Sequence, residues 1–397
     1  MVARAYPSDV FATPGAVPTP QSGKETSPSF QSDRVDATGA ASISIPIPTA
    51  PNRNGHVPQL SLSYSSKNPV RGGLAMGWEL DLPKIELDTA HGRVQETRYR
   101  ASEGGRLIQV DEATEAGWTA YRGEEDGSFT RYERKDGTTA QRWRARKTDG
   151  TVLYFGETAE SKDQGNEHSA FGAHEGRWFI TRSVDKFGNE IQYNYEKVMG
   201  YAPEGGDVAV DIALSSIEYG ANQNAALTHH TTIHFDYKST PDFCDGSVGN
   251  VPIGALMDFR TGILIYRGAA RLQRVRLETR GPAGTAERRR LDLQYDEDEI
   301  QCQQGAAHAP LRILTSVAET AFALDGTATA LPAQTFEYNR LERAFDARRS
   351  TGTSLGGGRV GGSYVNSSGP SRRRRRPHLP LCAQRIGYLL KTGAISS

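Results

Sequence analysis

The sequence has 397 residues, which is long enough for one large all-β domain or two smaller ones with a buried core. Lysine plus arginine and aspartate plus glutamate each number 47, so the formal net charge of zero excludes a global field that would attract nucleic acid or an anionic membrane. With 37% apolar residues and 42 glycines, the composition favours many short strands over long amphipathic helices.

The cysteines and the apolar runs restrict the class of protein further. Cys244, Cys302 and Cys382 are far apart and form no C-x-x-C pair, so we predict free thiols and no disulfide framework or zinc site. No apolar stretch approaches the roughly 20 residues that span a bilayer, and residues 1–10 lack the apolar run of a conventional signal peptide. We expect a protein without a membrane span that is secreted by another route, or cytoplasmic before export.

The amino-terminal part of the chain contains the stretch that organises the rest. Residues 1–35 have too few apolar side chains to offset the entropy of ordering, so we predict a disordered lead-in. Residues 42–47 (SISIPI) and 60–64 (LSLSY) then alternate with the period of a half-buried strand. Residues 72–78 (GGLAMGW) predict a tight glycine corner around one tryptophan, and a third alternation continues through residues 78–87.

Residues 91–156 are charged and punctuated by glycine, and they predict a meander of short strands. The expected strands are residues 106–110, 118–122, 128–134, 141–146 and 152–155. Aspartate-glycine pairs, which suit the positive φ angles of tight hairpin turns, lie between them. These pairs are residues 126–127, 136–137 and 149–150. Two further segments predict helical structure, a short turn within a polar loop at 157–175 and a short helix at 254–260.

A hairpin unit recurs between residues 178 and 338, in which an apolar strand and a polar turn precede a strand that ends in tyrosine. The expected opening strands are residues 178–184, 212–219, 272–279 and 311–319. The expected closing strands are residues 191–195, 233–237, 291–295 and 334–338. Repetition at this period predicts stacked hairpins whose apolar faces form one continuous sheet.

The character of the sequence changes after Arg340. The following residues are rich in serine and glycine, and five consecutive arginines occupy residues 372–376. We expect either the end of a truncated or frame-shifted gene or a basic linker. The expected domains are a disordered lead-in at 1–35, an all-β domain at 36–340 and a Gly/Ser/Arg-rich tail at 341–397.

Two motifs raise the question of ligand chemistry. His229, His230 and His234 lie close to Asp236, and residues 230, 234 and 236 share one face of a strand, so a divalent-metal site and a polar strand face are both compatible with the pattern. Residues 356–361 fit G-x-G-x-x-G, but their flanks do not predict the strand and helix that hold a pyrophosphate. We interpret residues 356–361 as a linker.

The remaining charged and aromatic clusters support no catalytic assignment. The acidic run at 296–299 lacks the spacing of a calcium loop, and the pair Glu124-Glu125 lacks the fixed separation of a catalytic acid and base. The arginines at 372–376 lack the interleaved aromatic residues of a nucleic-acid surface. We expect the four tryptophans to be core and corner anchors, with sugar-stacking platforms as the alternative. They are Trp78, Trp118, Trp143 and Trp178.

Several of these segments resemble a known family. Residues 42–78, with the SISIPIP opening, the VPQLSLSYSS strand and the GLAMGW corner, resemble the amino-terminal domain family of Salmonella virulence plasmid protein B (SpvB). This region is shared with the B components of insecticidal toxin complexes (TcB/TcaC-like). The likeness continues through residues 147–156 and 178–195. The turn at 185–189 (DKFGN) is similar to the tyrosine-aspartate (YD) repeats of Rhs proteins, which build hollow β-shells.

The pattern and the resemblance together give one interpretation. We expect an all-β fold of antiparallel meanders and hairpins that form part of an extended curved β-shell. The resemblance implies a non-enzymatic structural part of a toxin-complex or virulence protein, which with a C-type or Rhs-type polypeptide encloses and delivers a toxic cargo. We predict no catalytic, cofactor or metal residues, and neither the ADP-ribosyltransferase domain of SpvB nor the docking propeller of B components in this sequence.

Two other classes of function stay open at this point. One is a secreted surface module that binds glycans or proteins, because β-rich surfaces with exposed aromatic side chains bind glycans. The other is an enzyme fragment that has lost its catalytic domain.

Overall fold

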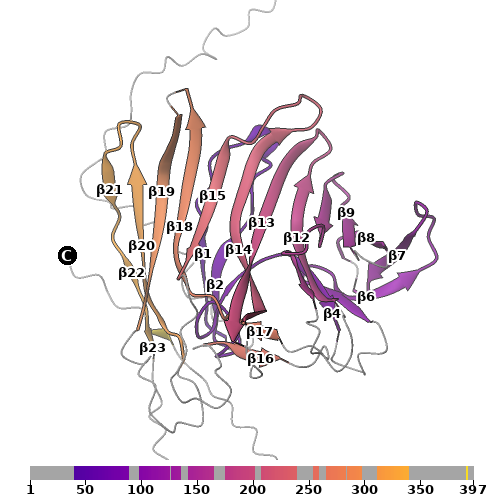
Figure 1. The fold of residues 1–397 in the computed structure, drawn as a ribbon, viewed down its shortest axis with the longest axis horizontal. Helices are drawn as coiled ribbons and strands as arrows, with labels where there is room; N and C mark the ends of the chain where they lie inside the picture. The colour runs from indigo at the N-terminus through magenta and orange to yellow at the C-terminus, as the bar shows by residue number, and fades with distance from the viewer. Residues whose placement is uncertain are drawn as a thin grey trace, which may run out of the picture.

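The structure is a computed structural model, and it describes residues 40–88, 98–125, 127–135, 142–164, 175–201, 207–238, 254–258, 265–282, 284–296, 311–338 and 390–391. Apart from one 3-10 turn, η1 (Arg53–Gly55), every regular element in these residues is a β-strand. None of the described helical structure has the length and apolar character of a membrane span. The expected fold class, antiparallel meanders and hairpins in a curved β-shell, is confirmed (Figure 1).

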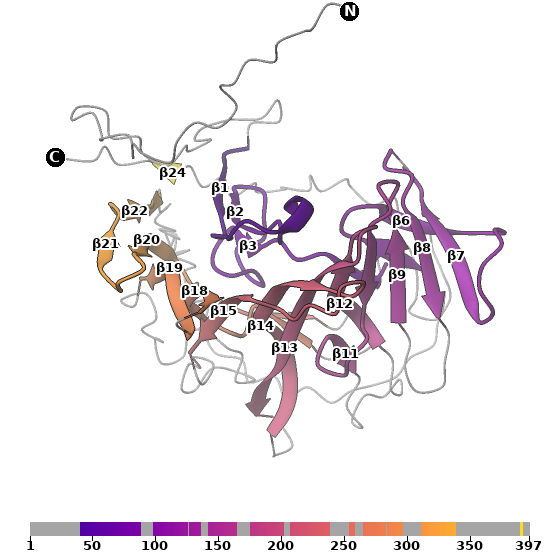
Figure 2. The same ribbon diagram turned by 90° about the horizontal axis from the view of Figure 1, so that it is seen from above.

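The organising stretch forms a small antiparallel sheet in the order β1-β2-β3. Its strands are β1 (Ser42–Pro46), β2 (Ser61–Ser65) and β3 (Trp78–Leu80). This sheet lies on the concave side of the large curved sheet (Figure 2). Its apolar side chains, such as Ile43 and Leu62, are buried against the large sheet, and the amide of Ala50 donates to the hydroxyl of Tyr219 there (2.6 Å).

The opposite face of β1 and β2 consists mainly of serine, and we call it the serine face. Ser42 pairs with Ser65 across the two strands, and Ser44 pairs with Ser63. The two serines of β1 are exposed and those of β2 are half-buried. The strict alternation of the sequence therefore separates apolar side chains from hydroxyl groups.

The glycine corner between β2 and β3 is confirmed. Gly77 has a φ of +74°, and a Cβ atom there would lie 2.6 Å from Cε2 of Tyr64, so a larger residue does not fit. The corner brings Trp78 into full burial, with its ring 5.5 Å from that of Tyr64 and 4.8 Å from that of Phe336. Its indole Nε1 donates to the hydroxyl of Tyr338 (2.8 Å).

The predicted meander is confirmed strand by strand, but the structure shows in addition that it closes on itself. Eight antiparallel strands form a ring in the order β4-β5-β6-β7-β8-β9-β10-β12, and β12 pairs back with β4. They are β4 (Lys84–Leu87), β5 (Tyr99–Ala101), β6 (Gly105–Val110), β7 (Trp118–Gly123), β8 (Arg131–Lys135), β9 (Arg142–Arg146), β10 (Val152–Phe155) and β12 (Glu175–Val184). A further strand, β11 (Lys162–Gln164), also pairs with β12.

Aromatic side chains fill the ring. The Trp143 ring lies 4.8 Å from that of Tyr99, 5.1 Å from Tyr121 and 6.1 Å from Trp178, measured between centroids. All three ring pairs are edge-to-face or tilted, which are arrangements that the aromatic quadrupole favours. The interior of the ring is therefore a packed core.

From β12 the sheet continues as one curved antiparallel layer (Figures 1 and 2). Its strands are β13 (Asn189–Tyr201), β14 (Asp207–Asn222), β15 (Thr231–Tyr237), β18 (Leu272–Gly281), β19 (Gly284–Tyr295), β20 (Leu314–Phe322), β21 (Ala328–Ala330) and β22 (Gln334–Thr335). Two short pairs lie beside it, β16 (Leu256–Asp258) with β17 (Ile265–Arg267), and β23 (Glu337–Tyr338) with β24 (Leu390–Lys391). The four predicted hairpins correspond to β12-β13, β14-β15, β18-β19 and β20-β22.

The closing tyrosines link each hairpin to its opening strand. The hydroxyls donate to main-chain carbonyls as follows: Tyr195 to Ile180 (2.6 Å), Tyr295 to Leu272 (2.7 Å) and Tyr338 to Leu314 (2.7 Å). The hydroxyl of Tyr237 bonds to the backbone of Leu214. These bonds explain why tyrosine, and not phenylalanine, recurs at the end of the unit.

The two predictions of helical structure are wrong where the structure describes the chain. Within 254–260, Leu256–Asp258 is strand β16, because the carbonyl of Gly254 accepts a bond from the amide of Gly72 (3.0 Å) and β16 pairs with β17. Within 157–175, Thr158 to Ser161 form a hydrogen-bonded turn, but Lys162–Gln164 is strand β11. Such short segments make a marginal helix, so pairing decides their conformation.

Candidate functional site

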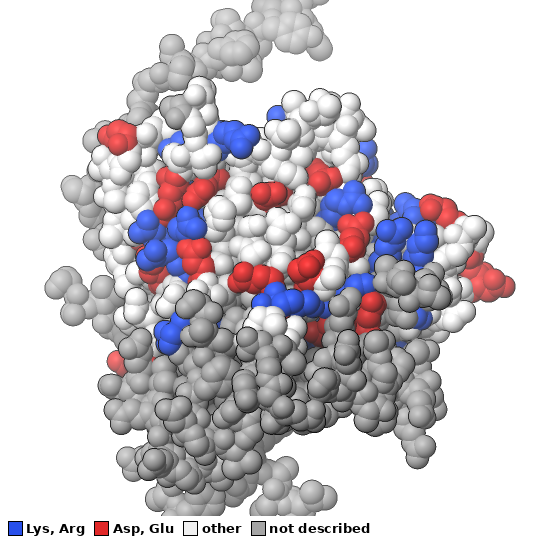
Figure 3. Space-filling view, viewed as in Figure 1, with Lys and Arg blue, Asp and Glu red and all other residues white. Residues whose placement is uncertain are grey.

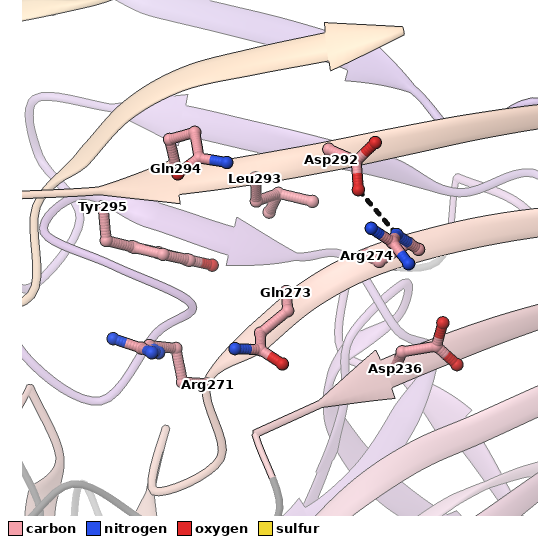
Figure 4. Close-up of a pocket in the computed structure, with 8 residues that line it drawn as sticks. All are labelled: Asp236, Arg271, Gln273, Arg274, Asp292, Leu293, Gln294 and Tyr295. Atoms are coloured by element: carbon pink, nitrogen blue, oxygen red, sulfur yellow. Dashed lines mark hydrogen bonds and ion pairs between the residues drawn. The ribbon is translucent and has the colours of Figure 1, made fainter. Parts of the chain in front are cut away.

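A polar pocket of about 260 Å³ lies where β18 begins and β19 ends. Its lining residues are Asp236, Arg271, Gln273, Arg274, Asp292, Leu293, Gln294 and Tyr295 (Figure 4). Adjacent strands supply most of them, so the pocket depends on the register of β15, β18 and β19. It contains neither serine, cysteine nor histidine, the usual nucleophiles and general bases.

The two carboxylates that line the pocket each bind an arginine. Arg274 Nε lies 2.6 Å from Asp292 Oδ1 (Figure 4), and Arg276 Nε donates to Asp236 Oδ2 (2.7 Å). The hydrogen bond from Arg276 lowers the pKa of Asp236, so its carboxyl is ionised at neutral pH and has no proton to donate. Burial raises the pKa of Tyr295. The pocket can therefore hydrogen-bond a polar ligand.

A second cluster of charges is buried where the ring meets the curved sheet. Arg177 of β12 binds Asp163 of β11 through Nε and Nη2, and its Nη2 also donates to Asp211 of β14 (3.3 Å). The main-chain amides of Ala269 and Ile212 donate to the carboxylate of Asp211 (2.9 and 2.8 Å). One guanidinium thus joins strands β11, β12 and β14.

The surroundings of Arg177 and Asp211 shift the pKa values of these two side chains. Burial alone would lower the pKa of Arg177, but the charges of Asp163 and Asp211 and the hydrogen bond to Asp163 raise it. Burial raises the pKa of Asp211, although Arg177 and two amides favour its ionised form. Among the described residues, no three His, Cys, Asp or Glu side chains are placed to hold a metal ion. We interpret the cluster as an ionic joint.

The outside of the ring carries a third network. Glu133 on β8 is buried and contacts the guanidinium groups of Arg131 (3.1 Å), Arg144 and Arg146 (3.2 Å). Trp118 on β7 packs against the network, and the Cζ atom of Arg144 lies over its ring, 4.0 Å from the ring centroid. Acidic and basic side chains also lie side by side over β18 to β20 on the visible surface (Figure 3). Within β19, Arg290 Nε lies 2.7 Å from Glu287 Oε1.

The histidine cluster predicted from the sequence is not assembled as a metal site. His234 and Asp236 lie on β15, but His234 faces Glu278 (3.4 Å) and Asp236 binds Arg276. His230 precedes the strand and bonds to Thr231 Oγ1 (2.8 Å). His229 lies 3.7 Å from Glu190 instead.

Other sequence candidates are exposed, or lie outside the described residues. Glu124 makes a surface pair with Arg106 (3.4 Å). The three cysteines, residues 356–361, residues 372–376 and residues 297–299 are outside the described residues. Asp296, at the start of the acidic run, donates its amide to the carbonyl of Ile313 (2.9 Å).

All four tryptophans were expected to be core or corner anchors, and three of them are. Trp78, Trp143 and Trp178 are fully buried, so they are not available to stack on a sugar. Trp118 is half-buried on the outside of the ring, beneath Arg144.

The sequence did not reveal the buried cations that join the segments. Arg312 is 1% exposed, and its guanidinium donates to the carbonyls of Gly268 (3.1 Å), Ala269 (3.3 Å) and Ala270 (2.9 Å). Arg177 is equally hidden within an apolar strand. A charged residue flanked by large apolar residues, as in Arg177-Trp178-Phe179, is the signal that could have identified them.

The comparisons with known proteins agree with this architecture. Residues 35–224 match the family model described as Salmonella virulence plasmid 65kDa B protein, SpvB. These residues are therefore similar to the SpvB family. They include β1 to β3, the closed ring and the first strands of the curved sheet. The resemblance of residues 42–78 to SpvB is thereby confirmed. A search of curated proteins found no match.

Solved structures are similar in fold over a larger part of the chain than residues 35–224. The N-terminal domain of the effector SpvB from Salmonella typhimurium strain LT2 is similar with a TM-score of 0.54 and 20% identity, over 71% of this chain and 99% of that one. The TcdB2-TccC3 crystal structure gives a TM-score of 0.59 and 19% identity over 78% of this chain. The Photorhabdus luminescens Tc holotoxin pore gives 0.58 and 20% over 76%. The chain spans 16% of each of these two larger chains.

Proposed function

We propose that residues 36–340 are a non-enzymatic wall segment of a toxin-complex type β-shell, which helps to enclose and deliver a toxic polypeptide. The observation that carries the proposal is the fold shared with TcdB2-TccC3 and with the SpvB N-terminal domain. The partner would be a C-type or Rhs-type polypeptide with its cargo, and export would precede action on a host cell.

The chemistry of the described residues supports a structural role. In the pocket, at the ionic joint and around Glu133, acidic groups are neutralised by arginines of the same chain. Such ion pairs fix the relative positions of strands. A carboxylate that is held by an arginine is less available as a general acid or base. A wall built from continuous antiparallel strands also satisfies its backbone internally.

The test is co-expression of the full chain with a C-type polypeptide that carries its toxic carboxy-terminal segment. We expect the two to elute together in size-exclusion chromatography, and the toxic segment to be cleaved more slowly by trypsin than in the C-type polypeptide alone. Separate elution and equal cleavage rates would contradict the proposal.

A second candidate is a binding module for glycans, and the pocket is the observation that favours it. The amides of Gln273 and Gln294 are exposed and suit the hydroxyls of a sugar. Retention of the chain on a glycan array, lost in Gln273→Ala together with Gln294→Ala, would support this alternative. Retention that survives both substitutions would place binding elsewhere.

A further inference from the structure

The large sheet ends differently on its two sides. On one side it runs through β12 into the eight-strand ring, whose strands are paired on both edges. On the other side the order ends at β21 and β22, which pair with β20 (Figures 1 and 2). Within the described residues no strand pairs with the outward side of β21 and β22. We call residues 326–336 the terminal edge.

The backbone of the terminal edge presents outward donors and acceptors that pair with no other described strand. The amide of Ala323 donates to the carbonyl of Thr327, and the amide of Leu331 donates to that of Glu319. In an antiparallel pair, residues that bond inward alternate with residues whose N–H and C=O point away. Ala328 and Ala330 fall between the inward-bonding positions, so their main-chain groups face away from β20.

The side chains of the terminal edge differ from those on the rest of the sheet. Strands β18 to β20 carry paired arginines and carboxylates, whereas residues 326–336 contain no charged side chain. All three residues of β21 are exposed, and Leu324 in the preceding turn is 88% exposed. Proteins usually protect an unpaired edge with charge. Here Pro332 limits the length of the edge, but no charge opposes pairing.

These features fit a short strand held by additional contacts. A second copy of the chain could pair here through only a few residues, far less than the roughly 1,000 Å² that a stable interface buries. A strand from a partner that is already attached elsewhere binds at a high effective concentration, so a short match suffices. The matched chains of TcdB2-TccC3 and of the holotoxin pore are about six times longer than their matched part, since this chain covers 16% of each.

We propose that the terminal edge is where a strand of the C-type or Rhs-type polypeptide adds to the sheet, antiparallel to β21, with Leu324 contacting an apolar side chain of that strand. The inference rests on the proposed function, because that function supplies the partner. The inference adds that the partner polypeptide contacts this chain at the terminal edge, by strand addition.

Two substitutions at one position test the edge in the full chain. Ala330→Pro removes the outward N–H without removing a bond to β20, and proline is tolerated on such edges. Ala330→Val keeps the N–H and favours a strand. We expect Ala330→Pro to weaken co-purification of the C-type polypeptide at least tenfold and Ala330→Val to leave it unchanged. Thermal unfolding of both variants should match the parent chain.

Hydrogen exchange separates this inference from the proposed function. Amides of Ala328 and Ala330 should exchange quickly in the chain alone and become protected in the complex. A complex that forms while these amides still exchange quickly would overturn the inference and leave the proposed function intact. Failure to form any complex overturns both. Protection that appears only as the concentration of the chain alone is raised would mean that a second copy occupies the edge.

Discussion

At the scale of single residues, buried polar side chains hold together segments that the sequence keeps far apart. Arg312 joins the glycine corner to the loop before β18, because its Nη1 reaches the carbonyls of Leu74 (3.4 Å) and Gly268 (3.1 Å). Its own carbonyl accepts the amide of Met76 (2.7 Å). A cation used in this way satisfies carbonyls that irregular segments cannot pair with one another.

Arg312→Ala should lower the free energy of unfolding by about 3 kcal/mol or more, since several buried carbonyls lose their donor and a cavity remains. Urea denaturation measures the loss. Arg274→Ala is the matched control, because Arg274 is partly exposed and its pair with Asp292 should contribute less than about 1 kcal/mol. Equal losses for the two variants would show that burial of Arg312 has no special role.

Asp185 organises the turn between β12 and β13. Its Oδ1 accepts the amides of Phe187 and Asn189 (both 2.9 Å), and its Oδ2 accepts the side-chain amides of Asn189 (2.8 Å) and Asn54 (3.2 Å). Burial would raise the pKa of this carboxyl, but these hydrogen bonds lower it below its ordinary value of 3.8. The ionised form is therefore the one that the fold requires.

Acid should weaken this turn. Because the pKa of Asp185 is lower in the folded chain, the unfolded chain binds more protons, so the stabilisation is complete above pH 3.8 and is lost as the pH falls through the folded pKa. Asp185→Asn should be less stable at pH 7, and its difference from the parent chain should shrink below pH 4. Melting temperatures between pH 3 and 7 measure this difference, and a pH-independent difference would contradict it.

At the scale of elements, the hairpin with a closing tyrosine is the unit of the curved sheet. Each unit pairs its own strands and uses the tyrosine hydroxyl to reach an opening strand, as Tyr195 does at Ile180. Tyr195 and Tyr193 lie on the same face of β13 and are both buried. Among the described residues, the Tyr193 hydroxyl has no hydrogen-bond partner. Comparing the two tyrosines therefore isolates the contribution of the Tyr195 hydroxyl bond.

Tyr195→Phe should cost about 1 kcal/mol of stability, because the carbonyl of Ile180 loses a buried donor while the ring is kept. Tyr193→Phe should cost less than half of that. Chemical denaturation of both variants measures the difference. If Tyr193→Phe proved the more damaging change, the hydroxyl bond would not explain the recurrence of tyrosine.

Local patterns predicted most of these elements, and contacts between distant segments account for what they missed. The alternation of residues 42–47 and 60–64 and the tyrosine-ended units are properties of neighbouring residues, so they can be read directly. The ring closes because Arg177 to Phe179 of β12 pair with Lys84 to Glu86 of β4. No local sequence pattern predicts this pairing. Strand β11 was missed for the same reason, since Lys162 and Asp163 resemble a polar loop until Glu175 and Arg177 neutralise them.

At the scale of the whole molecule, the ionic joint couples the ring to the curved sheet. Arg177 lies on β12, the one strand common to both, and binds carboxylates on β11 and β14. Lys162 of β11 adds a pair with Glu175 (2.7 Å), which also accepts a bond from Trp178 Nε1 (2.9 Å). The relative position of the two parts is therefore set by charges that water does not reach.

Arg177→Met should destabilise the chain by roughly 3–5 kcal/mol, because it leaves Asp163 and Asp211 buried without a cation. We also expect calorimetry to show one unfolding transition for the parent chain and two for Arg177→Met, because the ring and the curved sheet of the variant would unfold separately. Adding Asp163→Leu should recover part of the stability by removing one uncompensated charge. A single transition with unchanged midpoint in Arg177→Met would disprove the coupling.

The serine face has a consequence for anything held on the concave side of the sheet. The aromatic and aliphatic groups of β1 and β2 are turned toward the large sheet, so a polypeptide lodged there would meet the hydroxyls of Ser42 and Ser44 first. Serine hydroxyls carry no net charge and have little apolar surface, so they do not attract charged segments over a distance or pack extensively against apolar ones. If a polypeptide is enclosed there as proposed, we expect such a lining to let it shift without binding at one place.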